Sequence, residues 1–414
     1  MPSEPFVIVG GGLAGARAVS TLRTEGYDGD LVVVTSEPHR PYERPPLSKA
    51  YLRGQGDREA LFPLADDWYG ENGVDLRTSS TAAGIDPDAH RLTLGDGRDL
   101  PYSKLLLATG STPRSLSVTG RDLGGVHYLR TVEDADRLAG TLLPASLENQ
   151  VEVVVVGGGW IGMEVAASAR ELGLDVTVLD MGPHPLGAVL GPEMGEFYGT
   201  VHHEREVRVH RLAQVVRLTG SDGQVTGVDL ADGTHVAASV VVVGIGVQPN
   251  VGLARASGLE LRDQAQGGGV AVDGTLRTSH PDVFAAGDIA SIPSPHYGRP
   301  LRVEHWATAL ETGPHAARAM LGDPAQYDVL PYFFSDQFDV GMEYKGYVNM
   351  PGGYDEVVIS GSTSERAFVA FWVKDDAVQA GMAVNVWERM DDVERLIRRP
   401  DRVEREELEG FVGG

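Results

Sequence analysis

One pattern occurs twice in this chain and constrains its fold more than any other feature. A short apolar strand at Phe6–Val9 runs into the glycine-rich turn Gly10–Gly15, a helix and a second strand at Leu31–Val34. The same order starts again at Val153–Val156 and continues through the turn Gly157–Gly162. Apolar residues at helical spacing follow the first turn, which predicts a helix packed on the strands. Each copy is therefore predicted to be a βαβ unit.

Three spaced glycines in each turn have separate structural reasons. The first allows the tight turn out of the strand, the second lets the backbone approach a pyrophosphate, and the third lets helix and strand pack closely. The helix N-terminus then offers free N–H groups to the phosphates. The positions concerned are Gly10, Gly12 and Gly15 in the first copy and Gly157, Gly159 and Gly162 in the second, with Leu13, Ala14, Trp160 and Ile161 beginning the two helices.

An acidic residue ends the second strand of each copy. Glu37 and Asp180 stand about 20 residues after the third glycine, where a carboxylate accepts hydrogen bonds from ribose hydroxyls. A glycine-rich turn alone is often only structural. The complete pattern, present in both copies, predicts two dinucleotide-binding sites.

The absence of cysteine restricts the chemistry available at those sites. With no Cys residue, the chain has no disulfide scaffold, thiol nucleophile, redox-active Cys pair or cluster ligated by its own thiolates. Its histidines lack the spacing of a metal site, so no metal is predicted. Electron chemistry must then use bound cofactors, and the predicted use of two dinucleotides is hydride transfer from a nicotinamide nucleotide to FAD.

Charge and length limit the partners and the organisation. The 59 acidic residues exceed the 35 basic ones, giving a net charge of −24 that disfavours nucleic acid and anionic membranes as partners. A length of 414 residues favours two or three domains. The start of the chain lacks the basic segment and the apolar core that are typical of a signal peptide. No apolar run approaches the ~18 residues of a membrane span. These features predict a cytoplasmic protein.

Further motifs resemble those of a known family. The strand ending in Ala108-Thr109-Gly110, its echo at Val240–Gly246, and the strand that closes on Gly287-Asp288 match the pattern of two-dinucleotide flavoprotein reductases. The segments Tyr42–Lys49, Gly157–Glu164 and Val303–Trp306 resemble the ferredoxin reductases of bacterial oxygenase systems, of the putidaredoxin reductase type. Apoptosis-inducing factor and monodehydroascorbate reductase share much of this pattern.

The resemblance implies an α/β fold with two Rossmann-like domains, as in glutathione reductase, and a smaller α+β C-terminal domain. The implied FAD-binding domain is discontinuous, covering residues 1–112 and 248–325, with the NADH-binding domain at 113–247. The interface domain would cover 326–414 and begin an antiparallel sheet near Tyr332. Near the end of the chain, mixed charges between Glu388 and Glu409 predict one or two exposed helices with Trp387 and Leu396 turned inward.

Two residues are implied to be catalytic. In the family, the lysine that corresponds to Lys49 lies beside the flavin ring, where an ammonium stabilises the negative charge of the reduced ring. Glu164, just after the second glycine turn, would face the nicotinamide and could pair with Lys49. Taken singly, Lys49 could be a solvated loop lysine and Glu164 an acid favoured near a helix N-terminus.

The remaining implied contacts divide between the two cofactors. For FAD they are Gly10, Gly12, Leu13, Ala14, Gly15, Glu37, Arg44, Lys49, Ala82, Ala108, Thr109, Gly110, Arg130, Gly287, Asp288 and Trp306. For NAD they are Gly157, Gly159, Trp160, Ile161, Gly162, Glu164, Asp180 and Gly246. Arg44 and Arg130 could equally form surface salt bridges. Asp180 favours NADH because it would repel a 2′-phosphate, and no arginine follows it before His184.

The implied acceptor is a ferredoxin, of the [2Fe–2S] type or another iron–sulfur carrier, that serves a cytochrome P450 or ring-hydroxylating oxygenase. Because the chain is acidic, an acidic ferredoxin would need a local basic patch. The candidates are Arg40, Arg44, Lys49, Arg53 and Arg58 in one segment, and His296, Arg299 and Arg302 in another. Quinones, radicals or oxygen as acceptors, and a redox-sensing role, stay open as alternatives. A monomer or weak homodimer is expected.

Overall fold

The computed structural model describes residues 4–147 and 151–413, which form two compact units. The first unit comprises the described residues up to Glu43 together with Arg58–Thr112 and Gln248–Pro331. The second comprises Arg44–Asp57, Pro113–Val247 and the described residues from Tyr332 onward. Two of the points where the chain passes from one unit to the other lie in β8 (Ser111–Pro113) and β17 (Val247–Pro249).

The first unit is built on a five-stranded parallel sheet with the order β19-β7-β1-β2-β3. Its strands are β19 (Val283–Ala285), β7 (Lys104–Leu107), β1 (Phe6–Val9), β2 (Leu31–Val34) and β3 (Val74–Arg77). The strands β1 and β2 are buried at every position, which is typical of a parallel sheet covered on both faces. The predicted first βαβ unit is confirmed, since β1 and β2 pair in parallel and flank α1 (Leu13–Thr24) in the sequence.

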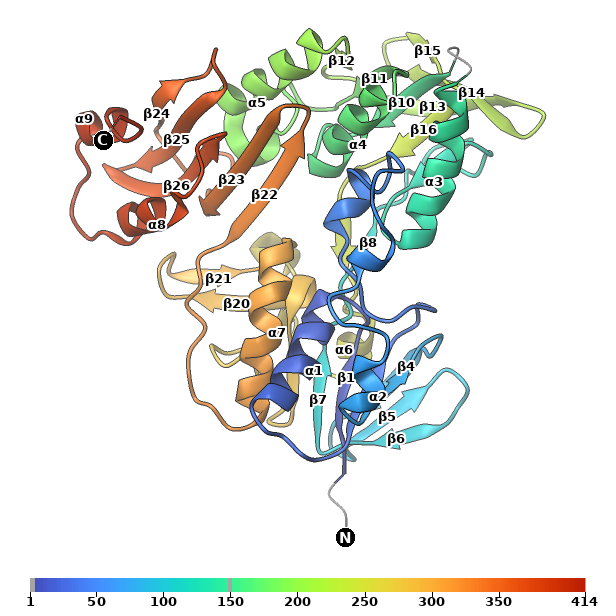
Figure 1. Ribbon diagram of the computed structural model, residues 1–414, viewed down its shortest axis with the longest axis vertical. Coiled ribbons are helices and arrows are strands. Elements are labelled where there is room, and N and C mark those ends of the chain that lie inside the picture. Colours follow the sequence, from blue (N-terminus) through green and yellow to red (C-terminus); the bar gives the residue numbers. More distant parts are fainter. Residues whose placement is uncertain (1–3, 148–150, 414) are drawn as a thin grey trace. The chain divides into compact units, whose positions relative to one another are not determined.

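Two helices of the first unit lie side by side (Figure 1), namely α1 and α7 (Trp306–Met320). A Cβ atom at Gly313 of α7 would lie 2.4 Å from the carbonyl oxygen of Ala14, so only glycine allows this approach. Smaller elements complete the unit. They are β4 (Ala82–Asp86), β5 (Arg91–Leu94), β6 (Asp99–Pro101), β18 (Val270–Ala271), β20 (Ala290–Ser294), β21 (Arg299–Leu301), α2 (Trp68–Glu71), α6 (Gly252–Ala256) and short 3₁₀ turns at Glu59–Leu61, Gln264–Gln266 and Gly287–Ile289.

The second unit contains another five-stranded parallel sheet, with the order β12-β11-β10-β16-β9. The strands are β12 (Arg208–His210), β11 (Asp175–Leu179), β10 (Glu152–Val156), β16 (Val240–Val243) and β9 (Val126–Tyr128). They are accompanied by α3 (Val132–Ala145), α4 (Trp160–Glu171), α5 (Gly187–Glu204) and a meander of β13 (Val215–Ser221), β14 (Gln224–Leu230) and β15 (His235–Ala237). The second predicted βαβ unit is thus also present.

The C-terminal part of the second unit is a five-stranded antiparallel sheet with the order β22-β23-β26-β25-β24. It consists of β22 (Tyr332–Gln337), β23 (Val340–Gly346), β24 (Glu356–Ser362), β25 (Ala367–Lys374) and β26 (Ala377–Val384), followed by α8 (Met390–Arg398) and α9 (Arg405–Glu409). Its apolar residues join those of α4 and α5 in one core. Inside that core the fully buried Trp372 donates from Nε1 to the Leu190 carbonyl at 2.9 Å.

The prediction for the end of the chain is right for one residue and wrong for the other. Leu396 of α8 is buried as expected, whereas Trp387 is 55% exposed. Trp387 precedes α8, and its ring contacts Gly341, where a Cβ atom would lie 2.6 Å from the indole. No helix within residues 4–147 and 151–413 combines the length and apolarity that a bilayer crossing needs.

Candidate active site

The first glycine turn has the geometry that its sequence predicts. A Cβ atom at Gly10 would lie 2.0 Å from the Ala108 carbonyl oxygen, and one at Gly15 would lie 2.4 Å from the Gly10 carbonyl oxygen. At Gly12 a Cβ atom would meet nothing within 4 Å, so the backbone there borders open space. Leu13 and Ala14 then begin α1. The turn therefore presents backbone N–H groups to a phosphate at a helix start.

The second glycine turn repeats this geometry in the second unit. A Cβ atom at Gly157 would lie 2.3 Å from the Gly244 carbonyl oxygen, and one at Gly162 would lie 2.0 Å from the Gly157 carbonyl oxygen. Gly159 again borders open space. Trp160 begins α4, with its ring edge-on to Tyr198 and Phe333. Ile161 beside it is 43% exposed.

The two strand-end carboxylates lie where the pattern predicts. Glu37 follows β2 and accepts a hydrogen bond from the Tyr42 hydroxyl. Asp180 follows β11, and its Oδ2 lies so close to Gly158 that a Cβ atom there would approach to 2.5 Å. Burial raises the pKa of Asp180, while backbone N–H groups, including that of Gly182, oppose the rise.

Beside Asp180 lies a charged cluster that the sequence did not reveal. Glu196 of α5 accepts from Arg211 at 2.8 Å and lies 3.0 Å from His184 Nδ1. Arg211 belongs to the segment after β12, whose backbone pairs with that of Asp180 and Gly182. The sequence shows no arginine directly after Asp180, but the fold brings one close from about 30 residues away.

Polar side chains fix the turns at the carboxyl ends of β7 and β19. Thr109 donates to the Asn250 carbonyl at 2.8 Å, and the Asn250 side chain donates back to the Thr109 carbonyl at 2.9 Å. Asp288 is buried and accepts from Ser111 at 2.9 Å. Ala108 packs against the first glycine turn, and Gly287, at φ 69°, lies against Ala14. These residues therefore surround the first glycine turn.

The other predicted contacts are placed as follows. Trp306 begins α7, directly after the partly buried His305, and desolvation lowers the pKa of His305 to about 4. Ala82 begins β4, and Gly246, at φ 92°, lies between β16 and β17. Arg44 donates to the Arg130 carbonyl at 2.6 Å, so the two arginines are neighbours within the second unit.

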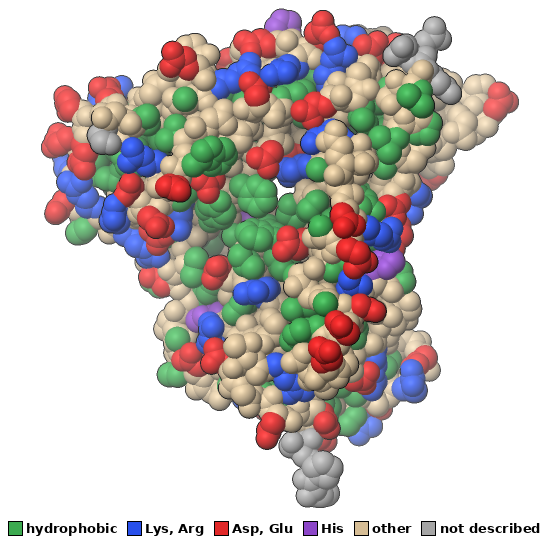
Figure 2. Space-filling model, viewed as in Figure 1, with side chains coloured by type: hydrophobic (Ala, Val, Ile, Leu, Met, Phe, Trp, Pro, Cys, Tyr) green, Lys and Arg blue, Asp and Glu red, His purple; other side chains and the backbone are tan. Residues whose placement is uncertain are grey.

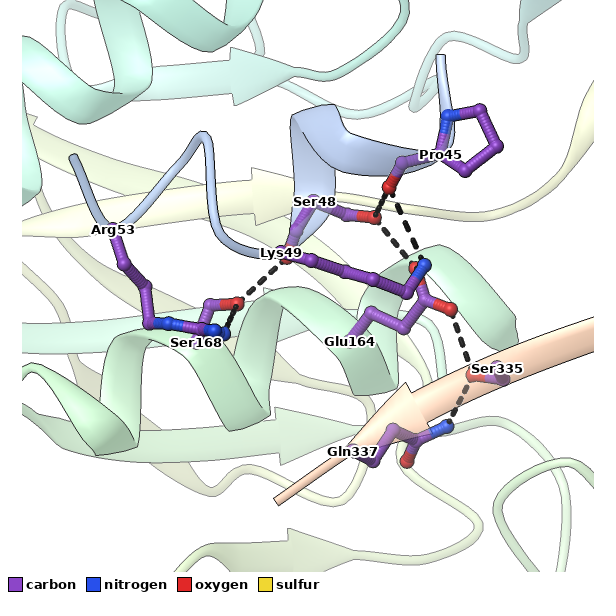
Figure 3. A network of polar contacts seen from close by, with 8 residues as sticks. All are labelled: Pro45, Ser48, Lys49, Arg53, Glu164, Ser168, Ser335 and Gln337. Atoms are coloured by element: carbon purple, nitrogen blue, oxygen red, sulfur yellow. Dashed lines mark hydrogen bonds and ion pairs between the residues drawn. The ribbon is translucent and has the colours of Figure 1, made fainter. Parts of the chain in front are cut away.

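Lys49 and Glu164 form the central ion pair of the second unit. Lys49 follows the 3₁₀ turn η1 (Pro45–Ser48), and Glu164 is the fifth residue of α4, near its N-terminus as expected. The Lys49 Nζ lies 2.7 Å from Glu164 Oε2, with the two side chains 15% and 4% exposed. Figure 3 shows the lysine extended toward the carboxylate. The ion pair predicted as an option is therefore present.

Two hydroxyl groups complete the surroundings of Glu164 (Figure 3). Ser48 donates to Oε2 at 2.5 Å, and Ser335 of β22 donates to Oε1 at 2.7 Å. Ser168 of α4 donates to the Ser48 carbonyl at 2.7 Å and so anchors the turn that carries Lys49. Neither Ser335 nor Ser168 was among the predicted site residues, because no motif connects either serine to its partner across more than 100 residues.

Several residues of the predicted basic patches are paired with acids. Arg40 contacts Glu59 and Asp66, Arg53 contacts Glu171, and Arg302 contacts Glu304. Arg302 also donates to the Asp288 carbonyl at 3.1 Å, which gives it a structural role beside the first glycine turn. In Figure 2 basic and acidic side chains are interspersed on the face shown. The charge of these arginines is thus largely compensated locally.

These features fit the two predicted cofactors. Each glycine turn leaves its second glycine open and ends at a helix start that offers free N–H groups. Each also has a carboxylate at the end of the following strand. When bound, FAD and a nicotinamide nucleotide would supply hydride and electron transfer, a chemistry that no side chain of this chain provides.

The comparisons with known proteins agree with this arrangement. Residues 4–313 match the pyridine nucleotide-disulphide oxidoreductase family, and residues 332–410 match the reductase C-terminal domain. The ferredoxin reductase for the CYP199A2 system from Rhodopseudomonas palustris has a crystal structure similar to this chain. It is 34% identical, with a TM-score of 0.91, and the match covers 98% of this chain and 97% of that one.

Two curated relatives are also similar along most of the chain. The ferredoxin–NAD(+) reductase component of the anthranilate 1,2-dioxygenase system from Burkholderia cepacia is 37% identical over 96% of this chain and 95% of its own length. The monodehydroascorbate reductase of Arabidopsis thaliana is 39% identical over 83% of this chain and 70% of its own length. The predicted α/β fold and the resemblance to ferredoxin reductases are confirmed. The chain belongs to the pyridine nucleotide-disulphide oxidoreductase family and carries its reductase C-terminal domain.

Proposed function

We propose that this protein is an FAD-dependent reductase that takes hydride from NADH and passes electrons singly to a ferredoxin of a cytochrome P450 or ring-hydroxylating oxygenase system. The observation that carries the proposal is the Lys49–Glu164 ion pair, buried one turn into the helix of the second glycine turn. Similar proteins with ferredoxin reductase names support the choice of acceptor. Although the family is named for disulphides, the chain contains no cysteine, so a dithiol mechanism is excluded.

The residues of the two turns bind and orient the cofactors in this proposal. Gly12 and Gly159 allow the pyrophosphates to approach the backbone, while Glu37 and Asp180 accept from the ribose hydroxyls. Asp288 and Trp306 are assigned to FAD as well. Arg44 and Arg130 remain candidates for its phosphates, because guanidinium groups bind phosphate through paired donors.

The Lys49–Glu164 pair is assigned to the transfer itself. A fixed ammonium stabilises negative charge that develops nearby, and the effect is strong where water is excluded. Glu164 keeps Lys49 in place and, with a nicotinamide nucleotide bound, would accept from its carboxamide. Since both side chains are largely buried, their positions are set before the cofactors meet.

The nucleotide is NADH in this proposal because of the acidic groups near the second site. Asp180 accepts from a free 2′-hydroxyl and repels a 2′-phosphate. Glu196 pairs with Arg211 and His184, the nearby groups that would otherwise attract that phosphate. Both acids therefore favour NADH over NADPH.

The domain roles follow the same division. We assign FAD to residues 1–112 and 248–325, NADH to 113–247, and the partner-facing interface to 326–414. A monomer or weak homodimer and a cytoplasmic location remain predictions from the sequence.

The proposal is tested by comparing acceptors at equal concentration. Steady-state NADH oxidation would be measured with [2Fe–2S] ferredoxins, with a quinone and with monodehydroascorbate, using ferricyanide as the control for flavin reduction. We expect the highest kcat/KM for a ferredoxin. A higher value for the quinone or the radical, with full ferricyanide activity, would contradict the ferredoxin assignment and favour the small-molecule alternative.

A further inference from the structure

A line of hydrogen bonds leads from α5 through the C-terminal sheet to Glu164. The Nε2 of His202 lies 2.9 Å from Oε1 of Gln337, and the Gln337 amide nitrogen donates to the Ser335 hydroxyl at 3.2 Å. Ser335 then donates to Glu164 Oε1 at 2.7 Å. Figure 3 shows Gln337, Ser335 and Glu164. All of the side chains in this line are buried.

The direction of these hydrogen bonds is set by their chemistry. A carboxylate only accepts, so the Ser335 proton points to Glu164, and Ser335 accepts in turn from the Gln337 amide. The Gln337 oxygen then needs a donor, which must be His202 Nε2. Burial holds the pKa of His202 at about 4, so the ring is neutral with its proton on Nε2. Nδ1 of His202 has no hydrogen-bond partner in the described part of the chain.

The strand β22 presents this line on a face that is otherwise apolar. Phe333, Ser335 and Gln337 alternate on the buried face of the strand, and Phe333 packs edge-on against Trp160 of α4. If packing were the only requirement, apolar residues would suit all three positions. Burying a polar group costs free energy unless the group finds a hydrogen-bond partner. Here each side chain hydrogen-bonds to the next one along the line, up to Glu164.

From this arrangement we infer that Ser335, held by Gln337 and His202, is a positioning residue for Glu164, so that the C-terminal domain completes the site of hydride transfer. The inference rests on the proposed function in one respect, namely that the Lys49–Glu164 pair faces the reacting cofactors. Ser48 and Lys49 both contact Oε2. Ser335 alone among the described residues donates to Oε1, so it fixes the rotation of the carboxylate.

The placement of the pair is tested by competitive acetylation of the lysines in the unreacted holoprotein, quantified by mass spectrometry. Lys104, Lys345 and Lys374 serve as internal references for Lys49. Ser335→Ala and Gln337→Met each break the line of hydrogen bonds, at different points. Ser335→Thr keeps the hydroxyl group. Ser360→Ala is the matched control, since Ser360 is an equally buried serine of the same sheet that donates to the Glu409 carbonyl instead.

We expect Lys49 to be acetylated several-fold faster in Ser335→Ala and Gln337→Met, because its partner is no longer held. Stopped-flow reduction by NADH should show a transfer rate constant about tenfold lower at saturation, the effect of one hydrogen bond to a charged group. The dissociation constant for NADH should change less than twofold. Ser335→Thr should restore both values, and Ser360→Ala should leave both unchanged.

Wild-type Lys49 labelling in a folded Ser335→Ala or Gln337→Met protein would overturn the inference. So would equal damage in Ser335→Ala and Ser335→Thr, or in Ser360→Ala, because these results would indicate a packing effect. Faster labelling in a chain that reduces no ferredoxin would support the positioning of Glu164 and contradict the proposed function instead.

Discussion

At the scale of single residues, the Lys49–Glu164 pair depends on both partners. A buried charge that loses its partner is strongly destabilising, whereas a neutral pair of similar size is tolerated. Glu164 would keep its two hydroxyl donors but not its counter-charge if Lys49 were neutral. The stability of the second unit therefore depends on the interaction between Lys49 and Glu164 as well as on each residue alone.

We predict that Lys49→Gln lowers the free energy of unfolding by about 3 kcal/mol, because it leaves a buried carboxylate without its cation. The double variant Lys49→Gln/Glu164→Gln should recover part of this loss, although hydride transfer stays slow. Urea denaturation measures the unfolding free energy. Arg98→Gln is the control, since the Arg98–Asp96 pair is exposed and its loss should leave the free energy of unfolding almost unchanged. Additive effects in the double variant would contradict the coupling.

Nucleotide choice is also a matter of individual side chains. We predict that Asp180→Ser together with Glu196→Gln raises the ratio of kcat/KM for NADPH to that for NADH at least about tenfold. One change removes repulsion of the 2′-phosphate, and the other frees Arg211 to bind it through charge-assisted hydrogen bonds. Ferricyanide reduction reports the two values. Glu206→Gln, which releases the distant Arg170, is the control, and an unchanged ratio in the double variant would contradict the role of these acids.

At the scale of elements, the two kinds of glycine in the second turn should behave differently. A Cβ atom at Gly162 would collide with the Gly157 carbonyl, whereas one at Gly159 would meet no protein atom within 4 Å. We predict that Gly162→Ala lowers the melting temperature, while Gly159→Ala leaves it unchanged and weakens NADH binding. Thermal unfolding without nucleotide and titration with NADH separate the two effects. Equal melting temperatures for both variants would contradict the close packing of α4 on β10.

The same elements show what the sequence can predict. Strand β1 begins and ends where the apolar pattern places it, and β10 starts one residue earlier, because glycine turns and buried strands are coded by neighbouring residues. The contact of Ser335 with Glu164 spans 171 positions and depends on how two sheets pack, for which no local pattern exists. The position of Arg211 near Asp180 was not predicted either, because the two residues are far apart in the sequence. Trp387 was predicted wrongly because it precedes α8 and so does not belong to the buried face of that helix, which contains Leu396.

At the scale of the whole molecule, two desolvated neutral histidines, the buried His202 and the partly buried His305, make stability depend on pH. Burial lowers the pKa of His202 and of His305 to about 4, below the ordinary value near 6.5. The unfolded chain therefore binds protons that the folded chain does not. Their stabilising contribution is complete above pH 6.5 and is lost as the pH falls from 6.5 to about 4.

We predict that the free energy of unfolding falls with a slope approaching about 1.4 kcal/mol per pH unit for each histidine within this window. Denaturant unfolding at pH 7, 6 and 5 gives the slope. His202→Asn should reduce it by the share of one proton, while His203→Asn, at an exposed neighbouring position, should not. The same slope in His202→Asn and the wild type would contradict the buried neutral state of His202.

Electrons are proposed to pass from NADH through the flavin to a ferredoxin, and one anaerobic titration follows this whole path. The purified holoprotein would receive NADH in steps and then an oxidised [2Fe–2S] ferredoxin, followed at the flavin and cluster absorbances. We predict one flavin for each chain, full bleaching by NADH, and return of the flavin absorbance as about two clusters are reduced for each NADH consumed. A chain without flavin, or a bleached flavin that the ferredoxin does not reoxidise, would contradict it.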